Sequence, residues 1–138
     1  MTEERRLKNQ EIIREFRAND GEVGGNYAGI PLLLLHHTGA RTGESYVSPL
    51  VYLPHGEGWA VAAAAGGRPN HPSWYHNLLA NPDTELEVNT ARVPVTARVA
   101  KSAEHNSLTT RFHEETRFFT KFTEATTRTI PLVILDPR

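Results

Sequence analysis

The 138-residue sequence contains no cysteine, and this absence excludes disulfides, thiolate metal sites and a cysteine nucleophile. It also lacks any apolar run that approaches the roughly 20 residues needed to span a bilayer. The first twenty residues are rich in charge and have no apolar segment of the kind found in secretory signals. These absences predict a cytoplasmic protein.

Strong net charge and the common catalytic motifs are missing as well. The formal net charge is −1, so no global field would recruit nucleic acid, and no nucleic-acid partner is expected. Seven scattered histidines without HExxH spacing predict no metal site. Neither a nucleophile elbow nor a P-loop or dinucleotide fingerprint is present, so a serine hydrolase and a nucleotide-binding fold of those types are unsupported.

The pattern that is present predicts a single α+β domain over residues 1–138, with an N-terminal helix in 1–20 and a barrel with helices in 30–138. The helix over residues 3–19 places Ile12, Ile13 and Phe16 on one side, among mixed charges. A solvated helix docked by a few apolar contacts is favoured. Weak contact of this helix with a membrane surface is the alternative.

Short strand-like segments separated by turns predict an antiparallel β-barrel of about six strands, with helices packed outside. The expected strands are residues 30–37, 46–53, 59–64, 85–88, 93–99 and 130–135. The run Leu32–Leu35 does not alternate, which indicates a strand buried on both faces. Pro49 indicates an edge or a bulge in the second strand.

Two further helices are expected in the chain. Pro72 is placed to start one, with Asn70 or His71 as its cap, and that helix should end near residue 81. Ser102 is expected to cap a helical region that reaches about Arg128.

The segment Thr38-Gly39-Ala40-Arg41-Thr42-Gly43 has the composition of an anion-binding loop. Its glycines allow backbone N–H groups to converge, Thr42 adds a hydroxyl, and Arg41 adds a forked cation. The alternative is a long hairpin turn without a ligand.

The segment Ala62-Ala63-Ala64-Ala65-Gly66-Gly67 carries no side chain larger than a methyl group. A flat ring system could lie against this exposed backbone, and N–H groups could bond its edge. Arg68 follows directly and is placed for a carboxylate or a phosphate. The alternative is a plain strand end that packs under a large neighbour.

These two segments, taken with others, resemble the deazaflavin-dependent nitroreductase family over residues 9–137. The other segments that carry the resemblance are 15–19, 23–25, 31–35, 49–52, 71–82 and 128–133. The resemblance implies a split β-barrel that binds the deazaflavin coenzyme F-420, a hydride carrier with a phosphodiester and an oligoglutamate tail. It further implies hydride transfer from the reduced coenzyme to a small organic acceptor such as a quinone, an enone or a nitro compound.

The resemblance also implies the residues of the site. The expected cofactor contacts are Arg41, Thr42, Gly43, Ser48, Pro49, Ala62, Ala63, Ala64, Ala65, Gly66, Gly67, Arg68, Trp74 and Asn77. The residues expected to border the acceptor are Phe16, Tyr27, Phe119 and Phe122. No side chain need act as a nucleophile, and Tyr27, His36 or bound water could supply a proton.

The sequence departs from the family pattern at three places. Ala40 stands where the loop often has arginine, and Ala64 and Ala65 stand where serine and lysine or asparagine are common. Residues 116–122 offer phenylalanines but none of the tyrosines found in nitroimidazole-reducing relatives. An FMN-dependent split-barrel reductase, a non-catalytic deazaflavin carrier and a lipid-binding barrel therefore remain alternatives.

Overall fold

The computed structural model describes residues 3–138 and contains six strands and four α-helices. The helices are α1 (Glu3–Ala18), α2 (Ser73–Ala80), α3 (Ser102–Glu115) and α4 (Phe119–Glu124). The strands are β1 (Leu32–Thr38), β2 (Ser45–His55), β3 (Gly58–Ala62), β4 (Asp83–Val88), β5 (Ala91–Val99) and β6 (Leu132–Pro137). Short 3₁₀ turns, η1 (Gly25–Tyr27) and η2 (Ala65–Gly67), follow α1 and β3.

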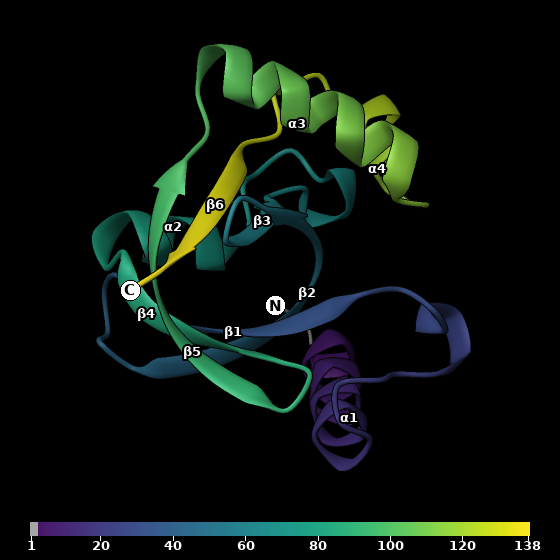
Figure 1. Ribbon diagram of the computed structural model, residues 1–138, viewed down its shortest axis with the longest axis vertical. Coiled ribbons are helices and arrows are strands. Elements are labelled where there is room, and N and C mark those ends of the chain that lie inside the picture. The colour runs from purple at the N-terminus through teal and green to yellow at the C-terminus, as the bar shows by residue number, and fades with distance from the viewer. Residues whose placement is uncertain (1–2) are drawn as a thin grey trace.

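The strands close into one antiparallel barrel in the order β1-β2-β3-β6-β5-β4, which confirms the predicted fold class. Four of the five sequence-adjacent strand pairs are neighbours, and the C-terminal strand β6 inserts between β3 and β5. Figure 1 shows α3 and α4 over one end of the barrel and α1 at the opposite end. No helix within residues 3–138 is long and apolar enough to cross a membrane.

Strand β1 is buried on both faces, as its unbroken apolar run predicts. Leu33 and Leu35 point into the barrel interior, where neither is exposed. Leu32 and Leu34 point outward and pack against α1 in the cluster that contains Phe16. The amphipathic face of α1 therefore docks on the outside of the barrel, and β1 joins the two apolar clusters.

Strand β2 changes its pairing partner partway along its length. It pairs with β1 from residue 45 to residue 51, but with β3 only from Tyr52 to His55. Pro49, which has no N–H to donate, lies in the half that pairs with β1 alone. The predicted edge position of Pro49 is thus correct, and one side of β2 is left open along the barrel wall.

Three local predictions were wrong. The residue that caps α2 is Pro72, without a side-chain hydrogen bond, so neither Asn70 nor His71 caps it. Ser102 is the first residue of α3, and Lys101 precedes it as the cap. The strand expected over residues 59–64 ends at Ala62, because the chain turns into helical backbone at Ala64.

The helical region expected from residue 102 to about 128 is two helices rather than one. Thr116 takes an extended conformation, and its hydroxyl donates to the carbonyl of Phe112 at 2.6 Å. The helix α3 ends at Glu115, and α4 begins at Phe119.

Gly58 is the position where the barrel tolerates no side chain. A β-carbon there would overlap the backbone carbonyl of Leu135 on β6. We expect Gly58→Ala to lower the free energy of unfolding by about 1–3 kcal/mol, because the β3–β6 pair must separate to admit the methyl group. The change is read from urea unfolding. Gly24→Ala is the matched control, since its β-carbon would meet no atom within 4 Å at an ordinary φ of −88°. Equal stability of the two variants would contradict this account.

Candidate functional site

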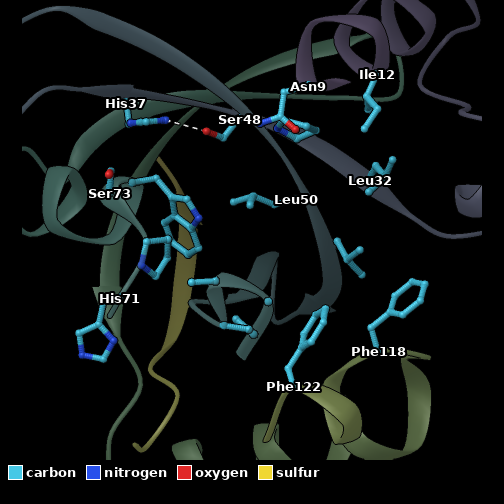
Figure 2. Close-up of a pocket in the computed structure, with 18 of the residues that line it drawn as sticks. Asn9, Ile12, Leu32, His37, Ser48, Leu50, His71, Ser73, Phe118 and Phe122 are labelled. Atoms are coloured by element: carbon cyan, nitrogen blue, oxygen red, sulfur yellow. Dashed lines mark hydrogen bonds between the residues drawn. The ribbon is translucent and has the colours of Figure 1, made fainter. Parts of the chain in front are cut away.

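A large cavity of about 1560 Å³ lies along the open half of β2. Residues 47–51 of β2 form one wall, and the other walls come from α1, α2, the η2 turn and the start of α4. Figure 2 shows His37 and Ser48 at one side of this cavity and Phe118 and Phe122 at the other. Pockets for a single small molecule usually measure about 300–1,000 Å³, so this cavity has room for two ligands.

The structure brings most of the predicted site residues together on this cavity. Those that line it are Tyr27, Arg41, Thr42, Ser48, Pro49, Ala62, Ala64, Ala65, Gly66, Arg68, Trp74, Asn77, Phe119 and Phe122. Those that do not line it are Phe16, Gly43, Ala63 and Gly67.

Each of these four residues has another place in the fold. Phe16 of α1 is 1% exposed and packs against the outside of β1, and Ala63 lies in the barrel interior. Gly67 packs so closely on α4 that an added β-carbon would lie 2.9 Å from the carbonyl oxygen of Phe122. Gly43 has a φ of +72° and turns the exposed 39–44 loop back toward β2.

The small-residue wall of the cavity has an unusual backbone. Ala64 is in the right-handed helical region, and Ala65 and Gly66 follow with φ values of +50° and +64°. A right-handed residue followed by a left-handed one turns successive N–H groups to the same side, which favours an anion or an electron-rich edge. A left-handed alanine costs of order 1 kcal/mol, and such strain is typical of functional sites.

Arg128 holds this wall from behind. Its guanidinium donates to the carbonyls of Ala63 (3.2 Å), Ala64 (2.8 Å) and Arg68 (3.0 Å). It also contacts Nδ1 of His71 at 2.8 Å. Arg128 thus satisfies three backbone carbonyls of this wall.

Cationic side chains line the same cavity. Arg41 and Arg68 make no hydrogen bond or ion pair within residues 3–138, and Arg5 of α1 is near enough for its charge to act on Arg68. Partial burial and, to a lesser extent, Arg5 lower the pKa of Arg68. Guanidinium groups that repel one another across a cavity provide a site for an anion.

A further side of the cavity, next to the η2 turn, is aromatic. The rings of Phe118 and Phe122 stack with their centroids 6.2 Å apart. Phe119 is 4% exposed and packs mainly on Phe112 and His113, so it contributes less surface than Phe122. Of the three proton donors considered, His36 lies outside the cavity, bonded to Glu87 at 2.7 Å.

Two buried polar side chains connect the 39–44 loop to β2. Asn77 is 8% exposed and His37 is 6% exposed. Asn77 accepts from the N–H of Ala40 at 2.9 Å and contacts Nδ1 of His37 at 2.9 Å. His37 Nε2 in turn lies 2.9 Å from Oγ of Ser48 (Figure 2). Burial, with a smaller contribution from His36, lowers the pKa of His37 to about 4, so the ring is neutral near pH 7.

Sequence reasoning missed several residues of the site. His37 and His36 are adjacent on a strand and therefore point to opposite faces, but the sequence does not indicate which face carries the site. Arg128 belongs to the segment 128–133 that carries the family resemblance, but the sequence assigns it no role. Asn9 and Ile12 line the cavity from the N-terminal helix, which the sequence did not place at the site. None of these positions has a local motif that would reveal its role.

The fold and the site together define a split-barrel reductase. The chain belongs to the F420H(2)-dependent quinone reductase family, whose model matches residues 8–137. It is 36% identical over 127 residues to an F420H(2)-dependent quinone reductase of Mycobacterium tuberculosis, covering 89% of this chain and 85% of the relative. This membership confirms the oxidoreductase class and coenzyme F-420 as the cofactor of the family.

Solved structures agree with this assignment. An F420-H2-dependent reductase superposes with a TM-score of 0.70 at 31% identity, covering 77% of this chain and 94% of that chain. A second structure, described as a domain-swapped dimer, has a TM-score of 0.71 at 29% identity and covers 96% of this chain and 98% of that chain. The heme storage protein HutZ of Vibrio cholerae, at 15% identity and a TM-score of 0.54, shares the fold.

The cavity fits a deazaflavin cofactor with an anionic tail. The wall at residues 62–66 has no side chain larger than a methyl group, which leaves backbone accessible to a flat ring. Arg41 and Arg68 supply cations that have no carboxylate partner within residues 3–138. Both requirements of the cofactor are met by residues that face one cavity.

The low pKa of His37 predicts a loss of stability in mild acid. As pH falls from 7 to 5, the unfolded chain takes up a proton at an ordinary histidine pKa near 6.5, while the folded protein does not. Stability should therefore fall by about 2 kcal/mol from this residue alone. We expect His37→Gln to lose less stability between pH 7 and pH 5 than the wild type, as measured by urea unfolding.

The pH window isolates His37 from the main acidic group of the barrel. Glu87 has a pKa of about 2, lowered first by hydrogen bonding to Arg17, and its contribution is lost only below its ordinary range near 4.5. An equal loss in the wild type and the variant would show that His37 is not the titrating group.

Proposed function

We propose that this protein transfers a hydride from reduced coenzyme F-420 to a quinone, and that both molecules lie in the cavity along β2. The observation that carries this proposal is one large cavity that offers a cationic, small-residue side and, next to it, an aromatic side. The first side suits a flat ring with an anionic tail, and the second suits an apolar acceptor. A volume of about 1560 Å³ allows both to be present together.

The cofactor supplies the hydride chemistry, and the residues of the chain bind, orient and exclude water. Arg41, Thr42 and Arg68 would hold the phosphate and the carboxylates. Ala62 and the N–H groups of residues 64–66 would meet the ring. Among the remaining predicted contacts, Ser48, Pro49, Trp74 and Asn77 face the same cavity and would complete the cofactor site.

The acceptor would lie against Phe122 and Phe118, with Tyr27 on the same cavity. A quinone ring gains dispersion and stacking energy on such surfaces without requiring a charged partner. Tyr27 is the only phenol among the expected acceptor residues, so it is the side chain that we propose to protonate the reduced acceptor, with water as the alternative.

A cytoplasmic location and weak contact of α1 with a membrane surface also belong to this proposal. Leu7 of α1 is 48% exposed between Arg6 and Lys8, which is an arrangement that anionic membranes attract. Glu3 and Glu4 in the first turn oppose it, so the expected contact is weak.

Parallel titrations with coenzyme F-420 and FMN test the cofactor. We expect tighter binding of the deazaflavin, and a roughly ten- to a hundredfold loss in Arg41→Ala, because charge-assisted bonds to the tail are removed. Arg14→Ala is the control, since Arg14 is exposed on α1 outside the cavity. Fluorescence gives the affinities, and reduction of a soluble quinone by the reduced coenzyme gives turnover.

The results separate the alternatives. Preference for FMN would make the protein an FMN-dependent reductase, and tight deazaflavin binding without quinone reduction would make it a carrier. Affinity for neither molecule would favour a lipid-binding barrel. An unchanged affinity in Arg41→Ala would remove the 39–44 loop from the cofactor site.

Leucine substitutions test the small-residue wall. Ala62 is half-buried on the cavity, whereas Ala63 has no exposed surface and lies in the barrel interior. We expect Ala62→Leu to abolish deazaflavin binding with little change in melting temperature. Ala63→Leu should instead lower stability by about 1–3 kcal/mol through overpacking. Normal binding by Ala62→Leu would place the ring elsewhere, and thermal unfolding of both variants provides the comparison.

A further inference from the structure

A series of hydrogen bonds from the 39–44 loop to the cavity has only one consistent direction. The N–H of Ala40 can only donate, so the Asn77 atom 2.9 Å away must be the amide oxygen. The NH₂ group of Asn77 therefore faces Nδ1 of His37, also at 2.9 Å. Because that group can only donate, Nδ1 is the nitrogen without a hydrogen.

The same reasoning extends to Ser48. A neutral imidazole carries a single hydrogen, and with Nδ1 accepting, that hydrogen is on Nε2. Nε2 lies 2.9 Å from Oγ of Ser48, so Ser48 accepts from His37. The hydroxyl hydrogen of Ser48 then cannot point at His37. Since Ser48 lines the cavity, its hydrogen is left for a molecule in that cavity (Figure 2).

We propose that Ser48 donates a hydrogen bond to an oxygen atom of the bound cofactor, and that His37 and Asn77 are positioning residues that aim its hydroxyl. This inference rests on the proposed function. The loop that carries Arg41 is tied to the same Asn77 through Ala40, so the oxygen belongs to the anionic tail, as a phosphate or a carboxylate. The backbone N–H of Ala40 thus determines, through Asn77 and His37, that the hydroxyl of Ser48 donates its hydrogen into the cavity.

If these hydrogen bonds only stabilised the fold, it would not matter which group in each pair donates. Buried polar groups need partners, and Asn77 and His37 satisfy each other in either tautomer provided that the amide rotates. Only the N–H of Ala40 prevents that rotation. The two tautomers of His37 differ in what they leave to Ser48. With the hydrogen on Nε2, Ser48 accepts from His37 and can donate to a ligand. With the hydrogen on Nδ1, Ser48 donates to His37 instead.

The tautomer of His37 can be measured without any ligand. In the nitrogen-15 spectrum of the imidazoles at pH 8, we expect His37 to be neutral with Nε2 protonated and Nδ1 bare. The opposite tautomer would overturn the proposal, because Ser48 would then donate to His37.

Binding of coenzyme F-420 tests the donor itself. We expect Ser48→Ala to weaken binding about tenfold and Ser48→Thr, which keeps the hydroxyl, to bind within about twofold of the wild type. Ser45→Ala is the matched control, because Ser45 is exposed on the same strand and lies outside the cavity. An unchanged affinity in Ser48→Ala would overturn the proposal.

Asn77→Asp tests the positioning role. The carboxylate still accepts from Ala40 but cannot donate to His37, so at pH 9 His37 should carry its hydrogen on Nδ1 and accept from Ser48. Binding should fall to the level of Ser48→Ala, and the double variant should be no weaker than either single variant. Additive losses would overturn the role of Asn77. A wild-type protein that does not bind the coenzyme would refute the proposed function instead, and the tautomer measurement would stand.

Discussion

The site depends on a strand that changes partners partway along the barrel. Strand β2 pairs with β1 over seven residues and then with β3 over the next four. A fully paired barrel of this size would fill its wall with hydrogen bonds and leave no lateral cavity. The gap along β2 lets α1, α2, η2 and α4 surround a space outside the barrel. Pro49 suits this strand half because it has no N–H to leave unpaired.

Burial on both faces of β1 makes that open half of β2 stable. Leu33 and Leu35 belong to the barrel interior, and Leu32 and Leu34 belong to the α1 interface, so β1 cannot shift by one residue without exchanging two apolar clusters. Strand β2 is registered on β1 along its whole open half. The cavity wall thus takes its geometry from a neighbour whose register is strongly specified.

The small-residue wall of the cavity offers backbone contacts in place of polar side chains. Ala64 and Ala65 have no polar side chains, but their N–H groups face one side because Ala65 is left-handed. Arg128 bonds the carbonyls behind them. Phe118 and Phe122 provide an apolar surface, which suits a quinone acceptor more than a polar nitro compound.

The sequence by itself determined the barrel, the strand burial and the two segments that line the cavity, because apolar periodicity, glycine and proline act locally. Leu32–Leu35 indicated a doubly buried strand, and Pro49 indicated an edge. Only the tertiary structure decided which side of each strand faces the cavity. It also placed Arg128 and His37 in contact with residues of the cavity wall. Their partners lie 65 and 40 residues away in the chain, at Ala63 and Asn77. Such contacts arise from the closure of the barrel, and no local sequence pattern records them.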